Sequence, residues 1–103
     1  MNQQAMLKKV RQMQKEMMEA QAEIEQTEFK ATSNVVTVVV MGTKELKRVE
    51  IDPSFEAEGP EDYEMLSDMI VAATSIAYRN IEKMTEEKMG KYQAMLGGFG
   101  GMF

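Results

Sequence analysis

The chain has 103 residues, of which 28% are charged and 44% hydrophobic, and its formal net charge is −5. This length and balance fit one globular domain and exclude a disordered or membrane-embedded chain. Histidine and cysteine are both absent, which excludes disulfides, thiolate chemistry, Ser-His and Cys-His nucleophiles, and zinc sites with nitrogen or sulfur ligands. We therefore expect a non-enzymatic protein with no catalytic residues, no metal and no cofactor.

Neither a secretory signal nor a membrane span is indicated. Residues 1–15 mix four basic side chains with glutamines, whereas a secretory signal needs an apolar core behind its basic region. The longest apolar run, residues 35–41, is interrupted by Thr37 and is much shorter than the ~20 residues that cross a bilayer. We expect a soluble cytoplasmic protein without membrane contact.

Residues 3–26 are predicted to form a long helix, because nearly all are good helix formers and none is Gly or Pro. Six apolar side chains recur at spacings of 4, 3, 4, 3 and 4, which is the pattern of a heptad seam. They are Met6, Val10, Met13, Met17, Ala20 and Ile24. On an isolated helix this seam would leave an apolar strip in water, so a partner helix is expected to cover it.

The period then changes from helical to alternating. Residues 27–32 alternate polar with apolar side chains, residues 33–34 fit a tight turn, and residues 35–41 are rich in β-branched side chains. These features predict a hairpin. The second run is apolar on both faces, so we expect a central strand with a covering layer on each side.

A second turn at Gly42 leads to a third predicted strand at residues 45–52. In this strand Val49 and Ile51 face one way, and the side chains between them face the other. The strand is expected to end at Pro53, because proline cannot donate to a ladder.

A second long helix is expected to begin at Pro60 or Glu61, after an acidic loop. Its broad apolar face comprises Met65, Leu66, Met69, Ile70, Ala73, Ile76, Ala77, Ile81 and Met84. Beyond Met84 the helix is expected to leave the core, and Gly90 to cap or kink it. We place one domain at residues 1–96 and a flexible Gly-rich tail at residues 97–103.

The first helix also carries a basic stripe, which we define as Lys8, Arg11 and Lys15. Their i, i+3, i+7 spacing places them on the face opposite the apolar seam, and Lys9 lies beside them. Basic side chains on a rigid helix can neutralise DNA phosphates without reading a base. The same pattern also fits an ordinary solvent-exposed helix face.

Lys83, Lys88 and Lys91 form a second basic group, but they point in different directions and alternate with glutamates. We rank them as weaker DNA-binding candidates, because pairing within the helix explains them equally well. The acidic residues of the 54–64 stretch lack the spacing and central glycine of a calcium loop. We expect these acids to be solvated.

Several segments together resemble the YbaB/EbfC family of nucleoid-associated DNA-binding proteins. They are residues 6–9 (MLKK), 12–14 (QMQ), 47–54 (KRVEIDPS), 71–73 (VAA) and 87–89 (EKM), so the resemblance covers nearly the whole chain. It implies an α+β fold with an α-β-β-β-α protomer, a three-stranded antiparallel sheet and long terminal helices. It also implies an intertwined homodimer with protruding helices, and DNA binding linked to nucleoid organisation or transcription.

From these observations we expect a homodimeric DNA-binding protein of the bacterial cytoplasm and nucleoid, in which the first helices contact phosphates through Lys8, Arg11 and Lys15, with Lys9 beside them. An alternative is a protein-interaction module that docks a replication or recombination partner through its Met-rich seam or its apolar tail. Salt dependence separates the two, because only phosphate contacts weaken steeply with added salt.

Overall fold

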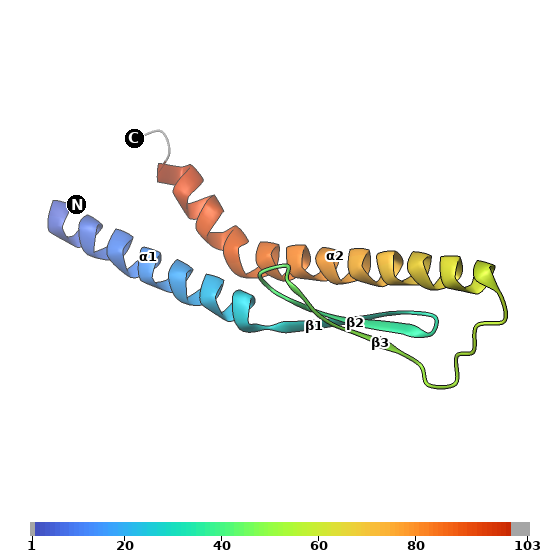
Figure 1. Cartoon of the computed structure of the whole chain (residues 1–103). Helices are drawn as coiled ribbons and strands as arrows, with labels where there is room; N and C mark the ends of the chain where they lie inside the picture. Colours follow the sequence, from blue (N-terminus) through green and yellow to red (C-terminus); the bar gives the residue numbers. More distant parts are fainter. Residues whose placement is uncertain (1, 100–103) are drawn as a thin grey trace.

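Two long helices flank a three-stranded antiparallel sheet in the chain order α-β-β-β-α (Figure 1). The computed structural model describes residues 2–99, and side chains as far as residue 95. The elements are α1 (Gln3–Gln26), β1 (Glu28–Ser33), β2 (Val36–Met41), β3 (Leu46–Ile51) and α2 (Pro60–Phe99). The predicted α+β architecture is confirmed. The tail predicted at residues 97–103 begins within α2, and residues 100–103 lie outside the described residues.

Helix α1 has the predicted bounds, because polar groups satisfy the backbone at both of its ends. The side chain of Asn2 accepts a hydrogen bond from the Gln4 N–H at 2.9 Å. At the other end the Thr27 hydroxyl donates to the Glu23 carbonyl at 2.7 Å, and the chain becomes extended. Only Thr27 separates α1 from β1, so the helix enters the sheet without a loop.

The apolar seam of α1 is covered by α2 of the same chain. Within α1, the six seam positions are the only residues that are buried or half-buried, and every other side chain is exposed. Met13 and Ile24 are fully buried there. Figure 1 shows the C-terminal part of α2 beside α1, with the two helices diverging towards their free ends. The partner helix that the seam predicts is therefore α2.

Strand β2 lies between β1 and β3, as its composition predicts. Val36, Val38 and Val40 are fully buried and form the core with Ala73 and Ala77 of α2, whose small side chains let the helix approach the sheet. Within one chain α2 covers only the face of the sheet that carries Val36, Val38 and Val40. The expectation of a covering layer on each face is therefore wrong for the single chain. On the opposite face Val39 is buried between its cross-strand neighbours, Lys30 and Arg48, whose long aliphatic stems shield it.

The two turns of the sheet depend on local backbone geometry. The first turn is at residues 34–35, one residue later than predicted, because Asn34 adopts a left-handed conformation with φ 53° that asparagine tolerates. The second turn brings Gly42 against the end of α1, where its N–H donates to the Thr27 carbonyl at 3.0 Å. This contact joins the β2–β3 turn to the junction of α1 and β1.

Helix α2 begins at Pro60 and remains helical through Gly90, so Gly90 does not cap it. Of the two predicted alternatives, a cap or a kink, the cap is wrong, and Figure 1 shows that α2 changes direction in its C-terminal part. The helix leaves the sheet in its C-terminal part, as predicted, and there it turns to α1, where Tyr92 is buried. Two members of the predicted apolar face, Met65 and Ile76, are exposed because they lie at its margin. No helix in residues 2–99 is long and apolar enough to cross a membrane.

Candidate nucleic-acid interface

The basic stripe of Lys8, Arg11 and Lys15 lies on the face of α1 that points away from α2. All three side chains are exposed, and the buried seam occupies the opposite side of the helix. At 1.5 Å per residue the stripe is about 10 Å long, so its three cations can approach neighbouring phosphates of one DNA strand. The helix therefore presents three cations at a spacing suited to a nucleic-acid backbone.

These cations are available to an outside anion. Among the described side chains, none of the ion pairs involves Lys8, Arg11 or Lys15. The first turn of α1 also contains no acidic residue, so the partial positive charge of the helix N-terminus is not offset there. Lys9 is exposed as well, but it lies about 100° around the helix from Lys8, nearer the seam.

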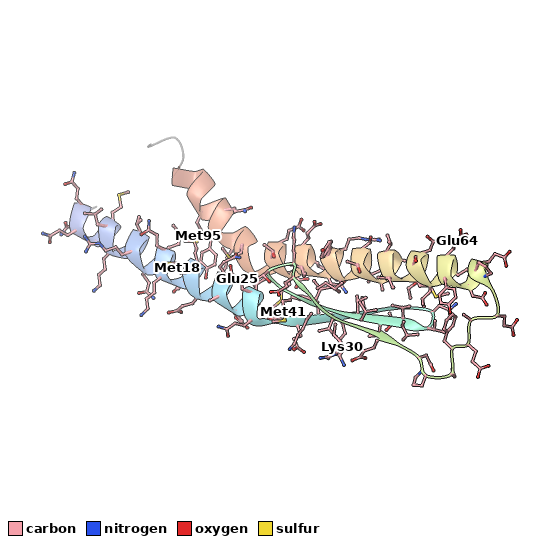
Figure 2. All side chains as sticks on the ribbon, viewed as in Figure 1. Met18, Glu25, Lys30, Met41, Glu64 and Met95 are labelled. Carbon is pink, nitrogen blue, oxygen red and sulfur yellow. The ribbon has the colours of Figure 1, made fainter. Side chains whose placement is uncertain are left out.

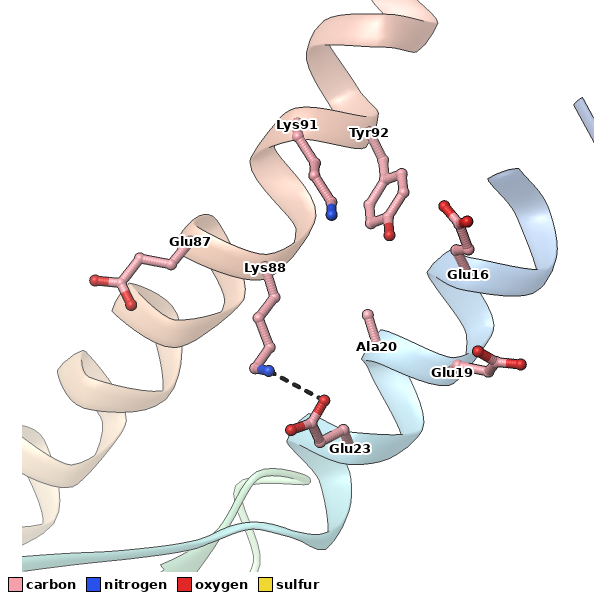
Figure 3. Close-up of a pocket in the computed structure, with 8 residues that line it drawn as sticks. All are labelled: Glu16, Glu19, Ala20, Glu23, Glu87, Lys88, Lys91 and Tyr92. Carbon is pink, nitrogen blue, oxygen red and sulfur yellow. Dashed lines mark ion pairs between the residues drawn. The ribbon is translucent and has the colours of Figure 1, made fainter. Parts of the chain in front are cut away.

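A cleft of about 390 Å³ separates α1 from the C-terminal part of α2, and its lining combines four glutamates with two lysines (Figure 3). The lining residues are Glu16, Glu19, Ala20, Glu23, Glu87, Lys88, Lys91 and Tyr92. Lys88 is neutralised there, since its Nζ lies 3.0 Å from Glu23 Oε2. Lys91 Nζ lies 4.9 Å from the centre of the Tyr92 ring, within the range of a cation–π contact.

The charges of α1 are separated along the helix. The basic stripe ends at Lys15, whereas Glu16, Glu19 and Glu23 follow it in the sequence and border the cleft. Sequence reasoning missed these three glutamates as residues that line the cleft. Their i, i+3, i+7 spacing repeats that of the basic stripe and could have revealed them.

The structure does not gather the three weaker candidates into one site. Lys88 and Lys91 line the cleft and contact Glu23 and the Tyr92 ring, respectively, whereas Lys83 is exposed and absent from the cleft. These contacts differ from the pairing within the helix that the sequence suggested, because Lys88 pairs with Glu23 of α1 and Lys91 lies over the Tyr92 ring.

The Asp52-Pro53-Ser54 segment forms a local turn at the end of β3. Asp52 Oδ1 accepts hydrogen bonds from the Ser54 N–H at 2.9 Å and the Ser54 hydroxyl at 2.7 Å. The backbone hydrogen bond, followed by that of the hydroxyl, holds the pKa of Asp52 below its ordinary value. The carboxylate therefore stabilises the turn. Separately, residues 2–95 contain no acidic cluster able to hold a metal ion.

Comparison with known proteins identifies the family of the chain. The family model of the YbaB/EbfC DNA-binding family matches residues 1–96. A nucleoid-associated protein of Lachnospira eligens is 49% identical over 83 residues, covering 79% of this chain and 70% of the relative. One from Lactococcus lactis subsp. cremoris is 42% identical over 94 residues, covering 89% and 93%, respectively.

The fold also matches a crystal structure of an uncharacterized protein from Helicobacter pylori, with a TM-score of 0.65. The two chains are 23% identical, and the match covers 93% of this chain and 98% of the other, so the likeness concerns the fold alone. The sequence match over residues 1–96 is what assigns the family. The chain belongs to the YbaB/EbfC DNA-binding family.

Proposed function

We propose that this protein binds duplex DNA as a homodimer in the bacterial cytoplasm, at the nucleoid, through phosphate contacts made by Lys8, Arg11 and Lys15. The observation that carries the proposal is the exposed basic stripe on the face of α1 opposite the apolar seam, which takes part in none of the ion pairs among the described side chains. The nucleoid-associated relatives support DNA as the partner. Lys9 adds charge at the edge of the stripe.

The net charge of −5 gives this binding a direction. Acidic side chains lie exposed on α2, as Glu64 does in Figure 2, and repel a polyanion, whereas the basic stripe of α1 attracts it. Phosphate contacts carry no sequence information, and we expect a modest sequence preference. This mode of binding suits nucleoid organisation or broad regulation of transcription.

The alternative, docking of a protein partner through the Met-rich seam, has no free surface to use. The seam residues of α1 are buried or half-buried beneath α2, so docking there would require the two helices to separate. The apolar end of the tail lies outside the described residues.

The test is a fluorescence-anisotropy titration of short duplex DNA at several salt concentrations. We expect salt-sensitive binding by the wild type and at least a tenfold loss in the variant K8E/R11E/K15E, because six phosphate contacts of a dimer are replaced by repulsion. A variant with the same net charge, K44E/K47E/R79E, changes exposed residues outside α1 and should retain most of the affinity.

Circular dichroism would establish that both triple variants remain folded. Equal losses in the two variants would mean that net charge, rather than the stripe, controls binding. Unchanged affinity in K8E/R11E/K15E would place the DNA on another surface, and absence of binding by the wild type at low salt would refute the proposal.

A further inference from the structure

The cleft between α1 and α2 contains a tyrosine hydroxyl without a partner in the protein. Tyr92 is 5% exposed, and Figure 3 shows its hydroxyl extending between the two helices on the side of Glu16. Among the described side chains no hydrogen bond involves this hydroxyl, whereas that of Tyr78 donates to the Lys44 carbonyl. A buried tyrosine hydroxyl usually has a hydrogen-bond partner. A molecule bound in the cleft can supply that partner.

The lining of the cleft favours a positively charged molecule. Its four glutamates outnumber its two lysines, and both lysines already have contacts within the chain. Lys88 lies 3.0 Å from Glu23 Oε2, and Lys91 lies over an aromatic ring. Apart from a 3.3 Å hydrogen bond donated by Gln12, the described side chains offer Glu16 no polar partner. The Glu16 carboxylate and Glu23 Oε1 can therefore accept hydrogen bonds from a cation.

The spacing of these two carboxylates indicates an elongated cation. Glu16 and Glu23 are seven residues apart, about 10 Å along the helix axis, and Ala20 lies between them. A single metal ion, with ligand bonds of about 2–2.6 Å, cannot bridge groups this far apart. Figure 3 shows the other two lining carboxylates, Glu19 and Glu87, turned away from the centre of the cleft. An aliphatic chain with an ammonium group at each end can bridge Glu16 and Glu23 while its methylenes contact Ala20.

We propose that the cleft binds a linear aliphatic polyamine, with one terminal ammonium at Glu16 and the Tyr92 hydroxyl and the other at Glu23 Oε1. An ammonium group donates hydrogen bonds and accepts none, so the hydroxyl oxygen serves as an acceptor. The volume of about 390 Å³ lies within the range of about 300–1,000 Å³ that small-molecule sites occupy. This inference goes beyond the proposed function, because the site requires no DNA.

The position of the cleft connects such a ligand to the basic stripe. Glu16 directly follows Lys15, the last residue of the stripe, so a bound ammonium offsets the negative charge that is next to the stripe in the sequence. DNA carries a condensed atmosphere of counterions, in which a polyvalent amine accumulates. The ligand is therefore concentrated where the stripe meets phosphates, and its binding removes a charge that opposes them.

The experiment is isothermal titration calorimetry of the full chain with spermidine at low ionic strength and without DNA. The wild type should show saturable binding. E16Q removes a charged acceptor and should weaken binding by about tenfold, whereas Y92F removes only the hydroxyl and should weaken it by about fivefold. E64Q has the same net charge as E16Q, changes an exposed residue outside the cleft, and should bind as the wild type does.

A second measurement holds the charge of the ligand constant. The terminal diamines of butane and octane carry the same two ammonium groups, but only the longer one can span the distance between Glu16 and Glu23. The octane diamine should bind at least about tenfold more tightly, since it alone gains a second charge-assisted contact. E16Q should abolish this advantage, which separates bridging from simple contact of the longer chain with apolar surface.

Each outcome decides for or against the cleft site. Absence of saturable spermidine binding by the wild type overturns it, as does unchanged affinity in E16Q or Y92F. An equal loss in E64Q, or equal affinity for the two diamines, would mean that net charge alone attracts the amine. Circular dichroism would establish that the variants remain folded. None of these results bears on DNA binding by the stripe, because DNA is absent from every titration.

Discussion

Gly42 is the residue at which the sheet and α1 approach each other most closely. A Cβ atom at this position would lie 1.7 Å from the Ile24 carbonyl oxygen, far inside van der Waals contact. The φ angle of Gly42 is not positive, so the requirement for glycine comes from space rather than from backbone conformation. A longer side chain here must push the β2–β3 turn away from α1.

We expect G42A to lower the free energy of unfolding by at least about 2 kcal/mol, because the added methyl forces backbone apart. G90A is the matched control, since nothing lies within 4 Å of a Cβ at that helical position. It should stabilise by about 0.5–1 kcal/mol, as alanine favours helix over glycine. Urea denaturation measures the change in the free energy of unfolding for both variants. A stabilising effect of G42A, like that expected for G90A, would contradict the close approach at Gly42.

Asp52 is a second residue whose local contacts make a measurable prediction. Its folded pKa is lowered, so its contribution to stability is present above the unfolded value near pH 3.9 and is lost as pH falls through the folded pKa. S54A removes the hydroxyl donor and keeps the stronger backbone donor. Carboxyl NMR titration should show the pKa of Asp52 rising while remaining below its ordinary value; no change would mean that the hydroxyl does not donate.

At the scale of the elements, the sequence pattern predicted the features that depend on local propensity and side-chain spacing. The helix at residues 3–26, the central position of β2 and the alanine contact face of α2 follow from helix propensity, β-branched side chains and spacing. The identity of the helix covering the seam could not be predicted, because a heptad pattern requires a partner without specifying which. The contact between Gly42 and Ile24 could not be predicted either, because it joins residues that are far apart in the sequence.

The packing of α1 on α2 depends on few buried side chains, so each should matter. Tyr92 is 5% exposed and points towards α1 from the C-terminal part of α2 (Figure 3). We expect Y92A to cost about 3 kcal/mol in the free energy of unfolding, as for other buried aromatic truncations. Q93A changes the exposed neighbouring residue and should be nearly neutral in the same denaturation experiment. A neutral Y92A would show that the two helices are separated in solution.

At the scale of the whole molecule, the charge distribution matters more than the net charge. The protein is elongated, with a longest extent of 72 Å, and its basic stripe occupies one arm. The sequence predicted this stripe because helical spacing alone fixes which face a side chain occupies. The sequence did not reveal the cleft, because the cleft exists only where α1 meets α2.

The number of phosphate contacts can be read from the salt dependence of DNA binding. Six contacts per dimer predict that log affinity falls with log salt at a slope of about −5. K15Q removes one contact from each chain, so its slope should be shallower by about 2. R79Q lies outside the stripe and should keep the wild-type slope. A slope unaffected by K15Q would mean that Lys15 does not contact phosphate.

The methionines between the two helices have a chemical consequence. Met13 is buried and Met6 and Met17 are half-buried in the seam of α1, and Met84 and Met89 are half-buried on α2. Conversion of such a thioether to its sulfoxide replaces a flexible apolar group with a polar one that a packed seam cannot accommodate. Oxidants would therefore change the angle between α1 and α2, and with it the position of the basic stripe. No charge on the protein would change.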